Sequence, residues 1–269
     1  MKQADPARFD GCRPEKHPLE GERRLFVKEK IYTIPLNEAF DADTECPFCY
    51  LYERLEQSRV EYTVGASMME PDSRMVTNEK GFCNRHLRQM EKCQQALSLA
   101  LVLDTHLNEV VKKLDTLKGE ISALTSPKKG LFQKAPDTVA AAEHLAAQTE
   151  RILESCAICD YIRETQERYM DTFFLLYRTE ADFKQKYQAG KGFCLEHFSM
   201  LVKLSGKHLK PADQTEFLKT LYEKEMENLR RINEEVNYFT KKFDYRFQNA
   251  DWKNSKDAPQ RTILKLVGK

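Results

Sequence analysis

The sequence has few glycines and prolines, no long apolar run and no excess of either charge. It contains 10 glycines and 10 prolines among 269 residues, which favours long helices over many short strands and turns. No uninterrupted apolar stretch approaches the length that spans a bilayer, so we expect no transmembrane segment. The 43 lysines and arginines balance 42 acidic residues. The resulting net charge of +1 gives no reason to expect binding to nucleic acid or to an anionic membrane.

The sequence also lacks the motifs of the common enzyme classes. It holds no P-loop, GxGxxG, HExxH or GxSxG pattern, which weakens the case for an enzyme. Residues 1–18 are polar and contain acids and prolines, unlike a signal or transit peptide. We therefore expect a cytoplasmic protein. In that reducing compartment a disulfide framework is not expected.

What the sequence does contain is eight cysteines, six of which fall in a pattern that occurs twice. The first repeat is Cys46-Pro-Phe-Cys49 followed by Gly81-Phe-Cys83-Asn-Arg-His86. The second is Cys156-Ala-Ile-Cys159 followed by Gly192-Phe-Cys194-Leu-Glu-His197. The distance along the chain from CxxC to GFCxxH is nearly the same in both. This predicts an internal duplication of a unit too small to be well stabilised by its own core.

Each repeat offers four ligands to a metal ion. Residues three apart at the start of a helix share one face, so CxxC presents two thiolates, and CxxH a thiolate and an imidazole. Such a quartet fits tetrahedral Zn²⁺ in a closed Cys3His site. The glycine of each GFC allows a tight turn into the ligand, and the phenylalanine can shield the site from water. The sequence thus predicts two zinc ions per chain, one bound by Cys46, Cys49, Cys83 and His86 and the other by Cys156, Cys159, Cys194 and His197.

Other uses of these residues stay open. An iron–sulfur cluster is the alternative metal group, thiol–disulfide chemistry is suggested by Cys46-Pro-Phe-Cys49, and buried structural thiols are the plainest interpretation. Four protein ligands leave no open coordination position, so the sites are expected to be structural rather than catalytic. The expected function is a zinc scaffold that acts through protein–protein contacts. A thiol or metal redox sensor is the alternative, and an enzyme with a pocket between the repeats is less favoured.

Helical periodicity predicts an all-α fold, an internally duplicated helical bundle with a long C-terminal helix. We expect an extension over 1–45, one half over 46–124, a linker over 125–136 and a second half over 137–210. A long helix and tail, 211–269, would pack on the halves. Only residues 24–35 are strand-like. The apolar residues that follow His86 at helical spacing are expected to bury one face of their helix: Leu97, Leu101, Leu107, Val111 and Leu114.

The long helix after Pro211 is the expected surface for a protein partner or for a second copy of the chain. The segment 241–269 mixes basic and aromatic residues, a composition that also occurs in proteins that bind single-stranded nucleic acid. Because the whole chain is nearly neutral, docking of these aromatics on the helices is the favoured interpretation, and nucleic-acid binding is not expected.

The two GFCxxH turns, residues 67–74, residues 243–247 and residues 256–268 together resemble an uncharacterised bacterial family catalogued as a domain of unknown function. The resemblance runs from about Ile31 onward. It implies that the chain is one complete protein whose C-terminal tail belongs to the domain. It carries no activity to this chain and implies only the eight ligands named above.

Overall fold

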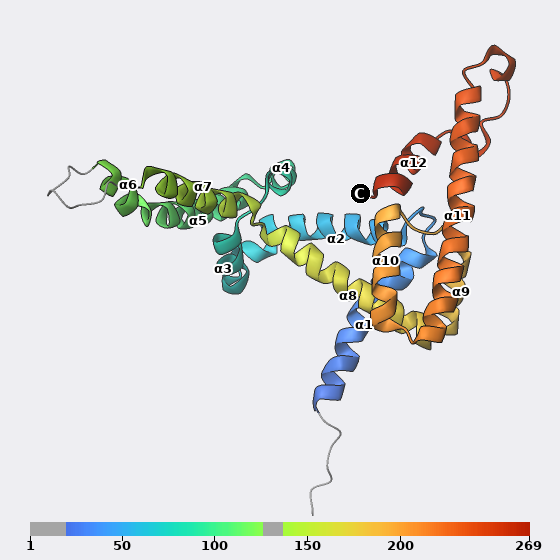
Figure 1. Ribbon diagram of the computed structural model, residues 1–269, viewed down its shortest axis with the longest axis horizontal. Coiled ribbons are helices and arrows are strands. Elements are labelled where there is room, and N and C mark those ends of the chain that lie inside the picture. The colour runs from blue at the N-terminus through green and yellow to red at the C-terminus, as the bar shows by residue number, and fades with distance from the viewer. Residues whose placement is uncertain (1–19, 126–136) are drawn as a thin grey trace, which may run out of the picture.

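The computed structural model describes residues 20–125 and 137–269, and every regular element in these ranges is helical (Figure 1). The predicted linker therefore lies outside the described residues except for Thr125, the last residue of α6. The all-α prediction is confirmed. In chain order the elements are α1 (Glu20–Asp41), α2 (Pro47–Val64), the 3-10 turn η1 (Ala66–Met69), α3 (Pro71–Lys80), α4 (Asn84–Lys92), α5 (Ala96–Asp115), α6 (Lys118–Thr125), α7 (Thr138–Glu154), α8 (Ala157–Thr179), α9 (Ala181–Ala189), α10 (Leu195–His208), α11 (Pro211–Lys241), the 3-10 turns η2 (Tyr245–Phe247) and η3 (Lys253–Ser255), and α12 (Ala258–Val267).

The strand-like stretch 24–35 is helical and forms most of α1. Its composition suits a strand, but buried residues at helical spacing continue from it into the residues that follow. Leu36 and Ala39 are completely buried, and Tyr32, one turn before Leu36, packs its ring edge-on against Tyr169 of α8. Residues at i, i+4 and i+7 share a helix face, so only a helix places these three against the core together.

The two repeats fold into the same order of helices. Each CxxC begins a long helix, α2 or α8; a short helix follows, α3 or α9; each GFCxxH then begins α4 or α10. Backbone angles agree at matching positions, with φ and ψ of −153° and 108° at Cys46 and −154° and 117° at Cys156. Gly81 and Gly192 both have positive φ, 65° and 78°. The backbone thus matches at the CxxC and GFC positions, while η1 is present between the helices of the first repeat alone.

Helices α2 and α8 pack side by side and run in opposite directions, joining two hydrophobic cores (Figure 1). The larger core is rich in aromatic rings gathered around Phe173 of α8, which contacts Phe40, Phe193 and Phe217. The smaller core lies at the other end of the pair: Val60, Val64, Phe82, Met90, Val102, Cys156, Ala157, Ile158 and Ile162. Each of the two helices thus begins at one core and runs towards the other.

The apolar stripe expected to be buried after His86 is exposed instead. The chain turns at Gln94, where φ is 57°, so α4 and α5 are separate helices. Helix α5 packs on α3, where Thr105 and His106 contact Asn78, and its only buried residues are Ser98 and Val102. Leu97 is 71% and Leu107 60% exposed. The prediction was wrong because α3 takes the more polar face of α5, where Arg74 donates a hydrogen bond of 2.8 Å to the Leu101 carbonyl.

The expected docking of the C-terminal aromatics on the helices holds only in part, because Phe243 and Tyr245 are 75% and 84% exposed. Helix α11 buries Phe217, Leu221 and Ile232 against neighbours that include α10 and α12, and Phe239 near its end contacts the Trp252 ring. Segment 258–267 forms α12, which returns along α11 towards α10 (Figure 1). No helix in the described part of the chain is both long and apolar enough to cross a membrane.

Candidate metal centres

The eight predicted ligands gather in two groups of four, and in each group the candidate ligand atoms all lie within 4.8 Å of one another. We call them site A, formed by Cys46, Cys49, Cys194 and His197, and site B, formed by Cys83, His86, Cys156 and Cys159. The expected grouping by repeat is wrong. Each CxxC meets the CxxH of the other repeat, so both sites join the two halves of the sequence.

Helix lengths favour this exchange. At 1.5 Å per residue, the 18 residues of α2 carry the chain about 27 Å from its CxxC, and the 10 residues of α3 can return at most about 15 Å. The same imbalance holds for α8 and α9, with 23 and 9 residues. The residues between these helices add further length, but in the structure neither CxxH returns to its own CxxC. Because α2 and α8 are antiparallel, the end of each lies near the start of the other.

The donor atoms are spaced as a tetrahedral ion requires. In site B, His86 Nδ1 lies 3.3 Å from the sulfurs of Cys83 and Cys156 and 3.4 Å from that of Cys159. In site A, His197 Nδ1 lies 3.5 Å from Cys46 and Cys49 Sγ and 3.0 Å from Cys194 Sγ. Zinc–ligand bonds of about 2.3 Å to sulfur and about 2.0–2.1 Å to nitrogen imply N···S separations of about 3.6 Å. The residues present therefore fit a single zinc ion at each site.

Helix N-termini surround both sites. Cys46, Cys83, Cys156 and Cys194 each occupy the N-cap position of a helix. Two of them also accept backbone hydrogen bonds at the sulfur, Cys156 from Cys159 N at 3.4 Å and Cys194 from His197 N at 3.5 Å. Backbone N–H groups and the positive end of the helix dipole favour thiolate over thiol. The fold thus presents each pair of ligands in a form suited to a cation.

Crowding lets one sulfur of each site ionise and opposes ionisation of its neighbours unless a cation is bound. Hydrogen bonds with Cys46 and Cys49 lower the pKa of Cys194. Burial opposes ionisation of Cys83, but hydrogen bonds with the His86 backbone and with Cys159 outweigh it and lower its pKa. Burial, followed by the charge of Cys156, raises the pKa of Cys159 to about 12. A hydrogen bond with Cys194 is the largest cause that raises the pKa of Cys49 to about 12. Three thiolates so close together repel one another, and a divalent cation reverses that balance because its charge is the largest in the site. The chemistry of the donor set is therefore that of a metal centre.

The two histidines are supported differently. His86 Nε2 lies 3.0 Å from Glu56 Oε1, and Gln89 donates a 3.0 Å hydrogen bond to the other carboxylate oxygen. Burial opposes ionisation of Glu56, but the hydrogen bonds from Gln89 and His86 and the charge of Arg85 outweigh it, so the pKa of Glu56 is lowered. A carboxylate at Nε2 holds the proton there and leaves Nδ1 free for the metal. His197 instead stacks its ring on Phe48.

Glycine is required in both GFC turns. At Gly192, a Cβ atom would lie 2.7 Å from Glu225 Oε2; at Gly81, one would lie 2.2 Å from His106 Nε2. Glu225 accepts a 2.8 Å hydrogen bond from Phe193 N. Lys265 donates to the carbonyls of Lys191 and Phe193, at 2.5 and 3.0 Å. These two buried charges fix the turn that carries Cys194.

Substituting Gly192 should therefore destabilise site A strongly, whereas a neighbouring glycine offers a matched control. Gly192→Ala forces alanine into a positive φ against the Glu225 carboxylate, so we expect a loss of about 1–3 kcal/mol in the free energy of unfolding. Gly190 has φ of −68°, and its added Cβ would meet nothing closer than 3.6 Å. Denaturant unfolding of the zinc-loaded protein measures both variants. Equal losses for Gly190→Ala and Gly192→Ala would contradict this account of the turn.

The C-terminal end of α12 covers site A. Gly268 has φ of +71°, and a Cβ there would lie 3.2 Å from Cys194 Sγ and 3.6 Å from Cys49 Sγ. The next residue, Lys269, forms an ion pair with Glu53 of α2. All four ligands of site A are buried, whereas Cys83 and Cys159 of site B are partly exposed. The two centres therefore differ in their access to solvent.

Sequence analysis missed the residues that support the sites. No motif marks Glu56, Glu225 or Lys265. Glu56 is one of several charged residues in α2, and Glu225 and Lys265 lie far from any ligand along the sequence. His106 lies outside the repeated motifs; its ring lies over the Gly81 turn, and its Nδ1 is 2.9 Å from the Asn78 carbonyl oxygen. A charged residue that recurs at helical spacing gives no signal until its neighbours in space are known.

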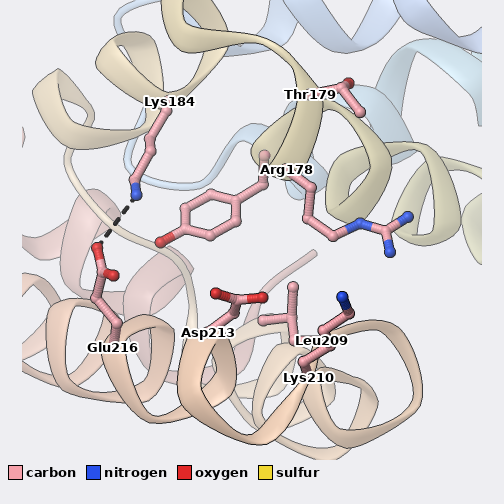
Figure 2. A pocket seen from close by; sticks show the side chains of 8 residues that line it. Arg178, Thr179, Lys184, Leu209, Lys210, Asp213 and Glu216 are labelled. Atoms are coloured by element: carbon pink, nitrogen blue, oxygen red, sulfur yellow. Dashed lines mark hydrogen bonds and ion pairs between the residues drawn. The ribbon is translucent and has the colours of Figure 1, made fainter.

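Two surface hollows in the described part of the chain are candidates for a small-molecule pocket, and neither is lined by a metal ligand. A hollow of about 580 Å³ beside α12 is lined mainly by charged side chains, among which Glu45 is paired with Arg231 and Arg261 at 2.5 and 3.2 Å. Another of about 410 Å³ lies between Tyr177 and the start of α11. Figure 2 shows Lys184 and Glu216 at one end of it, joined by a 3.2 Å ion pair. Neither resembles a pocket built around a reactive metal.

Comparisons with known proteins give one match. The family described as a family of unknown function, DUF6062, matches residues 27–269. No curated protein and no solved structure matches the chain.

Proposed function

Since the chain belongs to this family of unknown function, membership assigns it no activity, and we propose from its geometry that it is a helical scaffold held together by two structural zinc ions. Site A would hold one ion and site B the other, each closing four protein ligands around it. The ions would fasten the start of α2 to α10 and the start of α8 to α4. The proposed scaffold acts through contacts with other protein chains.

The observation that carries this proposal is the spacing of the donors in both sites. Their separations of 3.0–3.8 Å suit four atoms around one ion. An iron–sulfur cluster encloses several iron and sulfur atoms and needs its protein ligands set further apart. Zinc also favours mixed sulfur and nitrogen ligands in closed structural sites. Zinc is therefore preferred to the cluster.

The first experiment measures the metal content of protein purified without added metal or oxygen. We expect about two zinc ions per chain, as closed Cys3His sites predict, and no visible absorbance. Removing zinc with a strong chelator should unfold or loosen the helices in circular dichroism, because structural zinc contributes folding free energy on the order of 10 kcal/mol per site. Iron with broad visible absorbance, or a metal-free protein with unchanged stability, would each overturn the proposal.

A second candidate function, a sensor of oxidants, is favoured by one observation. Cys83 and Cys159 of site B are partly exposed, and their sulfurs are 3.8 Å apart, whereas site A is buried. Exposed thiolates are the ones that oxidants reach. In this candidate, oxidation of site B releases its ion and frees α8 from α4, while site A keeps the larger core together.

A further inference from the structure

The two sites differ in what joins their ligand pairs besides a metal ion. In site B the Ala157 N–H, next to Cys156, donates a 3.0 Å hydrogen bond to the Gly81 carbonyl. This backbone bond ties the start of α8 to the turn that carries Cys83. The matching residue in site A is Pro47, and proline has no N–H to donate. The corresponding bond therefore cannot form in site A.

A buried lysine of α12 makes the connection in site A instead. Lys265 is completely buried, and its ammonium group donates to the carbonyls of Lys191 and Phe193, at 2.5 and 3.0 Å. Both carbonyls belong to the GFC turn that leads into α10. The same ammonium nitrogen lies 3.9 Å from the carboxylate of Glu45, the residue directly before Cys46. One side chain thus reaches both ligand pairs of the site.

Further contacts hold α12 over site A. Arg261, one turn before Lys265, forms a second ion pair with the buried Glu45, at 3.2 Å. Figure 1 shows α12 running back towards α10, with which it is in contact. Just beyond the helix, a Cβ atom on Gly268 would lie only 3.2 Å from the Cys194 sulfur. The backbone after α12 therefore lies directly against a ligand.

We infer that Lys265 is the positioning residue of site A and that α12 is a clasp, which has to move away before the ion can leave. When α12 moves, the ammonium group loses its carbonyl partners, and a buried charge without partners is costly. The clasp therefore slows the release of zinc from site A. Site B has two partly exposed cysteines and releases its ion without movement of α12. The inference rests on the proposed zinc ions and assigns them different roles, one retained and one exchangeable.

The test compares Lys265→Met with a matched control, Lys242→Met. Lys242 is also buried and donates to backbone carbonyls, those of Phe247 and Gln248 at 2.7 and 3.2 Å, but it follows α11, a helix without metal ligands. Transfer of zinc from the full chain to excess chelator is followed with time, and mass spectrometry of alkylated cysteines shows which site opens. We expect Lys265→Met to speed release from site A about tenfold or more, because a charged donor loses two hydrogen bonds. Lys242→Met should leave both rates unchanged.

Supplying the missing backbone bond should reverse the effect. Pro47→Ala provides the N–H that Ala157 uses in site B. The backbone angles at the first cysteine of the two CxxC motifs agree, so this N–H points towards the Gly192 carbonyl. In the Lys265→Met chain, Pro47→Ala should therefore restore most of the slow release. A general loosening of packing around α12 would not be repaired by a substitution in α2.

The outcomes separate the clasp from the proposed scaffold. Two zinc ions per chain with equal site A release in the wild type and Lys265→Met overturn only the clasp. A double variant that releases zinc as fast as Lys265→Met overturns the positioning role. If Lys265→Met does not fold, the double variant should fold and bind two ions, and its failure to do so also overturns that role. A wild type without zinc defeats the scaffold; alkylation of Cys46, Cys49 and Cys194 then tests the clasp, since it should still be faster in Lys265→Met.

Discussion

Replacing two cysteines should release one zinc ion if both belong to the same site, and two zinc ions if they belong to different sites. Cys46→Ser with Cys194→Ser removes two ligands of site A and should leave about one zinc per chain in site B. Cys46→Ser with Cys83→Ser removes one ligand from each site and should leave almost none, because a site with three ligands loses most of its affinity. If each site were formed by the four ligands of one repeat, the first double variant would lose both zinc ions and the second would keep one. Elemental analysis of the purified variants distinguishes the two patterns.

A ligand exchange controls for loss of folding in these variants. His197→Cys keeps four ligands in site A, and sites made of four cysteines also hold structural zinc, so this variant should retain about two ions. If both double variants keep the same amount of zinc, the pairing of each CxxC with the CxxH of the other repeat, here called the crossed pairing, is wrong. If a double variant is purified unfolded, cobalt(II) is added to the single variants Cys46→Ser, Cys83→Ser and Cys194→Ser. Their absorbance spectra show whether one tetrahedral thiolate site survives in each.

The sequence was enough to find the ligands but not to pair them. Two residues three apart at a helix start make a local pattern, so each CxxC and CxxH could be identified without knowledge of the fold. Pairing depends on where helices end in space. The uninterrupted stretches that became α2 and α8, compared with the short helices after them, favour the exchange, but the connecting residues are long enough that helix lengths alone do not decide the pairing. The glycine role in the GFC turns was also predictable, since it acts next to a ligand.

The exposed apolar stripe of α5, which includes Leu97 and Leu107, shows a different limit. Periodicity predicts that an apolar face will be covered, but it does not say by which chain. Helix α3 packs on the side of α5 that carries Thr105 and His106, a polar face that sequence analysis had no reason to prefer. The stripe that looked like core is therefore at the surface. The same difficulty applies to the strand-like residues 24–35, whose helical state is fixed by Leu36 and Ala39 beyond them.

The crossed pairing also changes what the ions stabilise. Site A joins positions 145 to 151 residues apart, and site B positions 70 to 76 apart. Each doubling of a closed loop costs only about 0.6 kcal/mol more in chain entropy, which is small beside the contribution of a structural zinc ion. The entropy of the longer loops therefore does not prevent the crossing. In return, neither half of the chain can leave the other while either ion is bound.

Mild peroxide should release about one zinc ion per chain well before the second, and that ion should come from site B. Hydrogen peroxide accepts two electrons from the thiolates of Cys83 and Cys159, which form a disulfide, and with two protons it becomes two molecules of water. The two sulfurs start 3.8 Å apart and have only to close to the S–S bond length of about 2.05 Å. In site A the buried sulfurs lie beneath Gly268, so the oxidant reaches them later.

A zinc-sensitive dye follows the release with time, and mass spectrometry of the digested protein identifies the bond. We expect a peptide pair that links Cys83 with Cys159 and the return of zinc binding after reduction. Cys93→Ser removes a partly exposed thiol outside both sites and should leave the first release unchanged, which separates ligand oxidation from general damage. Simultaneous loss of both ions, or a first disulfide within site A, would show that exposure does not control the reaction. Because site A would still fasten α2 to α10, the oxidised chain should keep most of its helical signal.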